Sequence, residues 1–416
     1  MLEHYVKRIL SSRVYEIASE TPLSKAPLLS RRLGVDVSLK REDMQSIYSF
    51  KLRGAYNKMA SLSDQQKQAG VITASAGNHA QGVAISAQTL RMKASIVMGK
   101  NTPSIKVNAV RDRGAKVILH GDNYDEASVH ARALAEENDL TFVPPYDDID
   151  VIAGQGTIGM EIINQHEGPL DAIFIPVGGG GLIAGIAAYV KYLHPKTRII
   201  GVEAEGSACL QAAMTAGRRV KLPIEKLDLF ADGVSVAQIG QETFKVARHH
   251  VDDVVVVSVD EICAAIKDVF EDTRCISEPA GALSIAGMKR YLNQPHDMKA
   301  VAAIVSGANV NFDRLRHISE RAEFGESREA IFGVTVPEVQ GSFLKFCRAL
   351  GKRSITEFNY RRSDNNDAHI YVGLGIGSVQ DREGTRLGLE AKGYRCLLYT
   401  SPSPRDRQKW RRAGSA

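Results

Sequence analysis

Residues 172–193 read AIFIPVGGGGLIAGIAAYVKYL, which is an apolar run, four consecutive glycines and a second apolar run. The first run, Ala172–Val177, has the continuous Ile and Val character of a strand buried on both faces. The second run, Leu182–Leu193, has the length and composition of a helix. Because α/β proteins are built from strands that turn directly into helices, this stretch predicts an α/β fold with the glycines at the carboxyl end of a strand.

The alternation of strands and helices extends over the first 320 residues. Further parallel strands are expected at Gly70–Ser75, Ala94–Met98, Ala115–Leu119, Arg198–Glu203, Val254–Val259 and Ala300–Ser306. Further helices are expected at Ala80–Leu90, Tyr124–Asn138 and Asp260–Asp272. Continuous Val and Ile runs indicate sheets that helices cover on both faces. Ligands of such sheets bind beyond the carboxyl ends of the strands, so functional residues are expected there.

The pattern changes after about residue 325. Strands are expected at Ala330–Glu338, Ser354–Arg361 and Ala368–Gly375, and helices at Gly341–Leu350 and Asp381–Lys392. This β-α-β-β-α order is most of a ferredoxin-like unit. A closing strand should follow Tyr394, but residues 395–404 read RCLLYTSPSP. We therefore predict a partial α+β domain over residues 326–394 and a non-native or disordered tail over residues 395–416.

Composition excludes several classes of protein. The 416 residues are 44% apolar and 24% charged, as in soluble globular proteins of two or three domains. No apolar run reaches the ~18 residues that span a bilayer, and the start, Met1-Leu2-Glu3-His4, does not resemble a secretory signal. The five cysteines are scattered and none has zinc-ligand spacing: Cys209, Cys263, Cys275, Cys347 and Cys396. We expect a cytoplasmic protein without a structural metal.

The net charge of +5 does not indicate a nucleic-acid partner. Residues 401–416 hold five basic residues against one acidic residue, and so account for +4 of that charge. The rest of the chain is nearly neutral and offers no electropositive surface for a polyanion.

The glycine motif, Pro176–Leu182, is the first of four candidate site segments. Four glycines let backbone N–H groups converge on an anion at the start of a helix, with no Cβ in the way. No Gly-Lys-Ser/Thr follows, so the motif is not a P-loop. A phosphate-binding loop is favoured over a flexible turn.

The second segment is Thr73–His79, which also leads from a strand into a helix. Backbone amides and small side chains can bind a carboxylate there, and Asn78 supplies a neutral donor. A Ser or Asn helix cap explains the segment equally well. For His79, a capping or core position is favoured over a role as catalytic base.

The other two segments hold Lys51 and Ser306. A lone lysine near a helix start is usually solvated, but Lys51 follows Phe50 and precedes small residues. It can therefore be a desolvated amine of lowered pKa, suited to a Schiff base. The hydroxyl of Ser306, in Ser306-Gly307-Ala308-Asn309, either meets a ring nitrogen or belongs to a simple turn.

Taken together and in their order along the chain, the four segments resemble the threonine/serine dehydratases. These are a family of fold-type II pyridoxal phosphate enzymes with a tryptophan synthase β-like fold. Residues 201–205 (GVEAE), 270–272 (FED) and 277–282 (SEPAGA) are also similar to that family. The resemblance covers residues 1–394. It implies a catalytic domain over residues 1–325 with two open parallel or mixed sheets covered by helices. A small subdomain, about residues 40–145, is then inserted in the large one, with the cofactor between them.

The resemblance also implies a role for each segment. Lys51 matches the lysine that binds pyridoxal 5'-phosphate covalently, and Phe50 the residue beside the cofactor ring. Asn78 matches the amide that binds the ring 3-oxygen, and Ser306 the partner of the pyridine nitrogen. The phosphate is expected at Gly178, Gly179, Gly180, Gly181 and Leu182. The substrate carboxylate is expected at Ser75, Ala76, Gly77, Asn78 and His79.

Within the family, the sequence is most similar to the biosynthetic threonine dehydratases. Membership implies deamination of L-threonine to 2-oxobutanoate and ammonia, the first step of isoleucine biosynthesis, with L-serine as a further substrate. The C-terminal segment resembles an ACT-like regulatory domain. In the enzymes that carry this domain, isoleucine inhibits the activity and valine opposes that inhibition. Relatives are homotetramers or dimers, so self-association is expected.

Three alternatives stay open. A serine dehydratase or a serine racemase-like enzyme shares the lysine, asparagine and glycine motifs, and Ser75 is placed to serve as the acid that racemisation needs. Such relatives can bind a divalent cation near the position of Glu203, but Ser207-Ala208-Cys209 offers no acidic ligand, so no metal is predicted. A non-catalytic amino-acid sensor is the third alternative, and the intact Lys51 argues against it.

Overall fold

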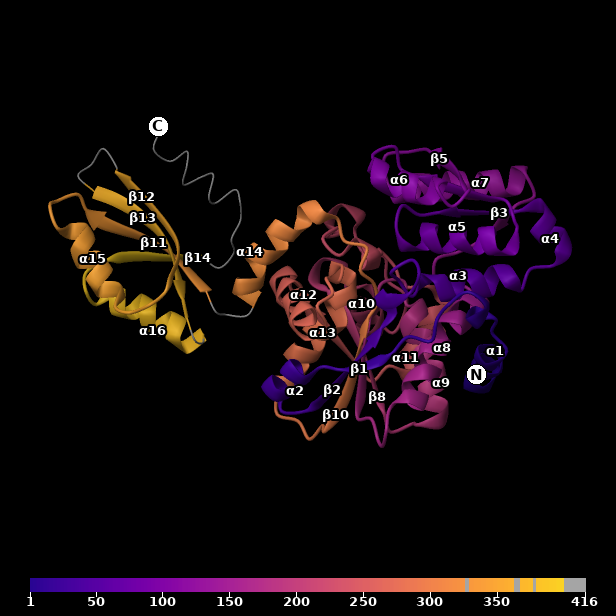
Figure 1. Ribbon diagram of the computed structural model, residues 1–416, viewed down its shortest axis with the longest axis horizontal. Coiled ribbons are helices and arrows are strands. Elements are labelled where there is room, and N and C mark those ends of the chain that lie inside the picture. Colours follow the sequence, from indigo (N-terminus) through magenta and orange to yellow (C-terminus); the bar gives the residue numbers. More distant parts are fainter. Residues whose placement is uncertain (326–328, 363–366, 377–378, 400–416) are drawn as a thin grey trace. The chain divides into compact units, whose positions relative to one another are not determined.

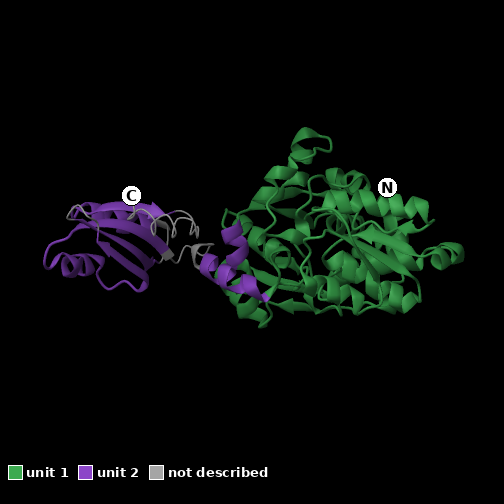
Figure 2. Cartoon of the chain, turned by 90° about the horizontal axis from the view of Figure 1, so that it is seen from above, with its two compact units in different colours: residues 1–258, 265–311 green, residues 259–264, 312–416 purple. Residues whose placement is uncertain are grey.

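The computed structural model describes residues 1–325, 329–362, 367–376 and 379–399. These residues form two compact units (Figure 2), the first consisting of residues 1–258 and 265–311. The second unit holds residues 259–264 and the described residues from 312 onward. No described helix is long and apolar enough to cross a membrane. The predicted α/β fold is confirmed.

The larger sheet of the first unit has six strands (Figure 1). Their order is β1 (Leu23–Lys25), β2 (Asp36–Arg41), β10 (Ala300–Val305), β7 (Ala172–Pro176), β8 (Arg198–Ala204) and β9 (Asp253–Val257). The edge strand β1 pairs antiparallel with β2, and all other pairs are parallel. The strand before the four glycines, β7, is thus central, as its continuous apolar character predicts.

Helices cover both faces of this sheet. Alternate residues of a strand point to opposite faces, so Ile173 and Ile175 pack into one apolar cluster while the Phe174 ring meets Tyr291 on the other side. The first face carries α8 (Ile149–Gln165), α9 (Gly181–Leu193), α10 (Cys209–Ala216) and α11 (Gln241–His250). The second face carries α13 (Pro279–Leu292), and α2 (Pro27–Leu33) packs on β2.

The smaller sheet is parallel throughout, in the order β5 (Lys116–Leu119), β4 (Ala94–Met98), β3 (Val71–Ala74) and β6 (Thr141–Phe142). Val71 and Ile96 pack with α3 (Lys51–Ala60), α5 (Asn78–Leu90) and α6 (Ser104–Arg111). Ile72 and Val97 face α7 (Tyr124–Glu137). Both faces are again apolar and covered, which explains why these strands could be expected from sequence.

Three helices that begin near the predicted site pack main chain against main chain. A Cβ atom on Gly154 of α8 would lie 2.8 Å from the Cα atom of Gly54 in α3. A Cβ atom on Gly185 of α9 would lie 2.6 Å from the backbone nitrogen of Gly156 in α8. Because any larger residue would separate these helices, the glycines fix how closely α3, α8 and α9 approach.

The other helices are short or peripheral. They are α1 (Leu2–Leu10), α4 (Asp64–Ala69) and the 3-10 turns Val14–Glu16, Glu42–Met44, Glu205–Ser207, Ile224–Lys226, Asp232–Val234 and Phe312–Arg314. The helix α12 (Val259–Thr273) contributes residues to both units.

The second unit contains an antiparallel four-stranded sheet. Its order is β12 (Ile355–Arg362), β13 (Asp367–Gly375), β11 (Glu329–Pro337) and β14 (Arg395–Tyr399), with α15 (Ser342–Leu350), α16 (Val379–Glu390) and α14 (Leu315–Gly325). The expected loss of the closing strand after Tyr394 is wrong, because β14 pairs with residues 331–335 of β11. Cys396 and Leu398 pack on the apolar core while Leu397 is exposed. This alternation of buried and exposed side chains is that of a strand, although turn-forming residues follow it directly. The rest of the predicted tail, residues 400–416, lies outside the described residues.

Candidate active site

Main-chain hydrogen bonds bring the Lys51 and Ser306 segments together at the carboxyl end of β10. The backbone nitrogen of Phe50 donates to the carbonyl oxygen of Ser306 over 3.2 Å, and that of Ala308 donates to Tyr48 over 2.9 Å. Ser49 and Gly307 form an antiparallel bridge between these two hydrogen bonds. The start of α3 is therefore anchored directly to the central part of the larger sheet.

Lys51 is the first residue of α3 and its side chain is half-buried. The Nζ atom donates a hydrogen bond to the carbonyl oxygen of Pro145 over 3.0 Å and lies 5.2 Å from the centroid of the Phe50 ring. Burial lowers the pKa of the Lys51 amine to about 8, although the carboxylate of Glu278 acts in the opposite direction. The amine is therefore available in its neutral, nucleophilic form near neutral pH.

The glycine loop lies next to the partner of Lys51. A Cβ atom on Gly179 would lie 2.2 Å from the ring of Tyr146, the residue after Pro145, and Gly180 has a φ of +90°. The carbonyl oxygen of Gly179 accepts hydrogen bonds from the Thr243 hydroxyl and from the backbone nitrogen of Gly240. The loop is thus held through its carbonyl groups. The first N–H groups of α9, from Gly181 onward, have no acceptor within their own helix and can bind an anion.

Asn78 is the first residue of α5, and both ends of its amide are engaged. Its Nδ2 atom donates to Oε1 of Glu278 over 2.7 Å, and its Oδ1 atom accepts from Nδ2 of Asn309 over 2.6 Å. The preceding loop is compact, since the hydroxyl of Ser75 accepts from the backbone nitrogen of Gly77 over 3.2 Å. Ser75 to Asn78 are all half-buried, Ala76 included, and Gly77 is the N-cap residue of α5. Their amides at this helix start suit a carboxylate.

The structure buries the His79 side chain beside the smaller sheet. Its Nε2 atom lies 3.0 Å from the carbonyl oxygen of Val143, and the ring is buried. Burial, together with the nearby Lys51 amine, lowers the pKa of His79 to about 3. The ring is therefore neutral and directed at the main chain, which leaves the backbone N–H of His79, and not its ring, for the role expected of this loop.

Ser306 follows β10 and is buried. Its hydroxyl donates to the carbonyl oxygen of Ala280 over 3.1 Å. A Cβ atom on Gly281 would lie 2.1 Å from the carbonyl oxygen of Gly307, so α13 begins in direct contact with this loop. The hydroxyl oxygen keeps its lone pairs and remains able to accept a hydrogen bond.

Glu278, Pro145, Tyr146 and Asn309 join the site although no site role was predicted for them. Glu278 is buried before α13, and burial, with Asp232 nearby, raises its pKa to about 7, while its hydrogen bond from Asn78 acts against this. An acidic residue among the small residues of the stretch 277–282 is a signal that could have found it. Tyr146 offers no such signal, because its contact with Gly179 joins residues far apart in the chain.

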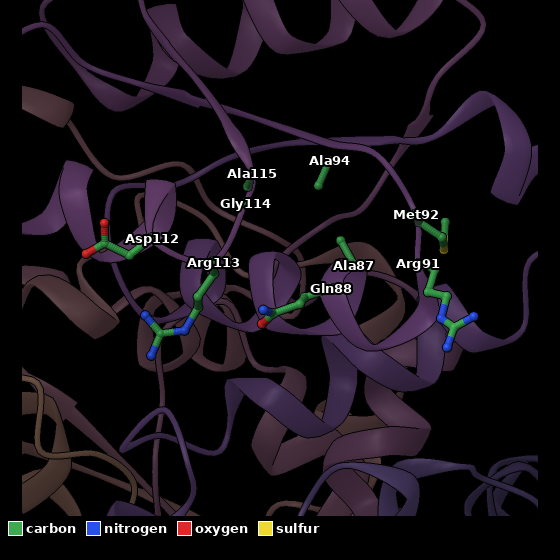
Figure 3. Close-up of a pocket in the computed structure, with 9 residues that line it drawn as sticks. All are labelled: Ala87, Gln88, Arg91, Met92, Ala94, Asp112, Arg113, Gly114 and Ala115. Atoms are coloured by element: carbon green, nitrogen blue, oxygen red, sulfur yellow. The ribbon is translucent and has the colours of Figure 1, made fainter.

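A pocket also lies beside the smaller sheet (Figure 3). It is lined by Ala87, Gln88, Arg91, Met92, Ala94, Asp112, Arg113, Gly114 and Ala115. Ala94 and Ala115 stand at the amino ends of β4 and β5, whereas the Ser75–Asn78 loop follows the carboxyl end of β3. Because these strands are parallel, the pocket lies at the amino ends of the strands and the Ser75–Asn78 loop lies at their carboxyl ends.

Known proteins resemble both units. Residues 14–307 match the pyridoxal-phosphate dependent enzyme family, and residues 320–404 match the C-terminal regulatory domain of threonine dehydratase. The chain is 53% identical over 392 residues to biosynthetic L-threonine dehydratase of Pasteurella multocida, covering 94% of this chain and 76% of the relative. It is 49% identical over 413 residues to the biosynthetic, chloroplastic threonine dehydratase of Arabidopsis thaliana, covering 99% of this chain and 69% of that one.

Two solved structures show the same fold. The processed form of threonine deaminase isoform 2 from Solanum lycopersicum has a TM-score of 0.75 and 50% identity, covering 77% of this chain and 93% of that chain. Serine racemase from Dictyostelium discoideum has a TM-score of 0.69 and 32% identity, covering 74% of this chain and 99% of that chain.

Proposed function

We infer the roles of the site residues from the premise that this chain belongs to the biosynthetic threonine dehydratases, a family of pyridoxal-phosphate dependent enzymes. Its activity is the deamination of L-threonine to 2-oxobutanoate and ammonia. The observation that carries the residue roles is the link between Lys51 and the glycine loop. The Lys51 amine donates a hydrogen bond to the carbonyl oxygen of Pro145, and the ring of the next residue, Tyr146, packs on Gly179. An amine and an anion-binding loop are thereby joined in one site.

The residues present fit pyridoxal phosphate. The lowered pKa of Lys51 suits covalent attachment to an aldehyde, and the loop from Gly178 to Leu182 suits a phosphate at a helix start. Phe50 lies beside the amine, and Asn78 and Ser306 supply the polar groups for the ring oxygen and the ring nitrogen. When bound, the cofactor withdraws electrons from the substrate Cα atom.

The chain's own groups then divide the reaction between them. The backbone amides of the Ser75–His79 loop bind the substrate carboxylate and orient the Cα–H bond. The Lys51 amine removes the Cα proton as a general base. Ser306, a neutral hydroxyl, stabilises a protonated ring nitrogen less than a carboxylate would. That favours direct β-elimination over a long-lived carbanion.

The lowered pKa of Lys51 predicts how cofactor attachment depends on pH. About half of the amine is neutral at pH 8, against about 0.3% for a lysine of ordinary pKa. The rate at which visible absorption appears after the apoprotein is mixed with pyridoxal phosphate should rise from pH 7 to 9 and then level off. A rate that still increases about tenfold from pH 8 to pH 9, where an amine of pKa about 8 gains less than about twofold, would show an ordinary, solvated lysine.

The activity is tested with L-threonine and L-serine as separate substrates and added pyridoxal phosphate. We expect 2-oxobutanoate from threonine at the higher rate and pyruvate from serine at a lower one. One observation favours a serine racemase instead: the hydroxyl of Ser75, the acid that racemisation would need, lies in the loop beside Asn78. D-serine is therefore measured in the same reaction. Faster formation of D-serine than of either 2-oxo acid would replace the dehydratase assignment.

The second unit supports a regulatory role. Its described sheet has all four strands, and its residues match a threonine dehydratase regulatory domain. We propose that it takes isoleucine as inhibitor and valine as its opponent, and that the protein is a homo-oligomer, a dimer or tetramer. A cytoplasmic location is supported by five free thiols.

A further inference from the structure

A continuous series of hydrogen bonds runs through Asn78. The carbonyl oxygen of Ile47 accepts from Nδ2 of Asn309 over 2.8 Å. The same Nδ2 atom donates to Oδ1 of Asn78 over 2.6 Å, and Nδ2 of Asn78 donates to Oε1 of Glu278 over 2.7 Å. The backbone N–H of Asn309 also bonds the Glu278 carboxylate. Segments before α3, at α5, before α13 and after β10 thus meet around one amide.

The direction of this series is dictated by its first member. An amide side chain can present either its oxygen or its nitrogen to a neighbour, and the surrounding partners decide which. A main-chain carbonyl such as that of Ile47 only accepts, so Asn309 must turn its NH2 group toward it. The second N–H of the Asn309 amide then donates to Asn78, so Asn78 must present its acceptor atom, Oδ1, on this side. The NH2 group of Asn78 consequently faces the Glu278 carboxylate, which also accepts.

One N–H of Asn78 remains after this series is complete. The NH2 group has two hydrogens, and Glu278 takes one of them. We propose that Asn309 is a positioning residue that fixes the Asn78 amide in this orientation and so keeps its second N–H available to the 3-oxygen of the cofactor. The proposal rests on the proposed role of Asn78 as a cofactor ligand. Asn309 itself acts only through Asn78.

The variant Asn309→Asp tests this orientation with little change of shape. A carboxylate cannot donate to Ile47 or to Oδ1 of Asn78, so the orientation of the Asn78 amide is no longer imposed. We expect pyridoxal phosphate affinity, measured by equilibrium dialysis, to fall about tenfold, the effect of one hydrogen bond to a charged oxygen. The visible absorption of the bound cofactor should shift, because the state of its 3-oxygen determines the colour. If Asn309→Asp does not fold, Asn309→Ala, which adds no charge, provides the same comparison.

A double-mutant cycle separates positioning from general stability. In an Asn78→Ala background, Asn309→Asp should change cofactor affinity by less than about twofold, because its target is already absent. The matched control is Asn57→Asp in α3. The Asn57 amide also bonds two main-chain groups, the nitrogen of Arg13 and the oxygen of Asp150. This control should leave affinity and absorption unchanged.

Three results would overturn the proposal. An equal loss of affinity in both backgrounds means that Asn309 acts independently of Asn78. No change in Asn309→Asp, where Asn78→Ala does change the absorption, means that the orientation is fixed by other groups. No change in Asn78→Ala itself removes the cofactor role of Asn78 as well. The dehydratase assignment is tested separately by 2-oxo acid release and survives any of these.

Discussion

Replacement of Lys51 by alanine is expected to lower 2-oxobutanoate release from L-threonine by about 10³-fold or more. Proton transfer by a positioned group alone contributes about 10²–10⁴ to an enzymatic rate, and this variant loses covalent attachment of the cofactor too. Lys51 occupies the only position at which the described residues join an amine of lowered pKa to the glycine loop. Initial rates with saturating pyridoxal phosphate measure the effect.

Two further variants locate the cause. Lys51→Arg keeps the positive charge but provides no primary amine, so it should be as inactive as Lys51→Ala and lack absorption near about 410 nm. Lys58→Ala removes a lysine from the same helix, where the amine pairs with Asp148 at 2.7 Å, and should retain activity. Near-normal turnover by Lys51→Arg would contradict the assignment of Lys51 as the attachment site.

The second large effect is expected from Arg53, two residues further along α3. The Arg53 guanidinium is fully buried and donates to both oxygens of Glu42 and of Glu161. The amine of Lys40 lies 2.5 Å from Glu161, so two buried cations balance two buried carboxylates. Burial alone would raise the pKa of Glu42, but Arg53 and Lys40 outweigh it and hold that pKa below its usual value.

Arg53→Met leaves two buried carboxylates opposite one lysine. Removal of one partner from a buried ion pair typically costs about 3–5 kcal/mol. For a unit of this size that corresponds to a decrease in Tm of about 5–8 °C. The control is Arg13→Met, because Arg13 is half exposed and pairs with Glu16 at the surface, where such pairs contribute about 0–1 kcal/mol. The decrease in Tm, measured by scanning calorimetry, should therefore be clearly larger for Arg53→Met than for Arg13→Met. Equal decreases would show that the buried ion pairs add no more stability than the surface pair.

The elements around the glycine loop could be predicted because their pattern is strong. Residues 172–177 were expected as a strand, and β7 spans Ala172–Pro176, since burial on both faces demands a continuous apolar run. The closing strand β14 could not be recognised in the same way. It is an edge strand of five residues with only two apolar side chains facing the core, followed at once by turn-forming residues.

The positions of the four site segments followed from sequence, but their connections did not. Ser306 and the glycine motif each lie where a predicted strand ends, which indicates the carboxyl end of a sheet for both, whereas Lys51 was expected only near a helix start. Which atom of Asn78 faces which neighbour depends on Ile47, Glu278 and Asn309, which no local pattern relates. The same holds for Tyr146 and Gly179, whose contact is created by tertiary packing.

The glycine contacts between α3, α8 and α9 have a consequence for mutational tolerance. Lys51 is the first residue of α3, the glycine loop leads into α9, and both helices contact α8 at glycine positions where main-chain atoms approach closely. The distance between the start of α3 and the glycine loop is therefore fixed by backbone atoms, which no change of side-chain rotamer can move apart. A substitution library aimed at new substrates should hold Gly54, Gly154, Gly156 and Gly185 constant and diversify the Ser75–His79 loop instead.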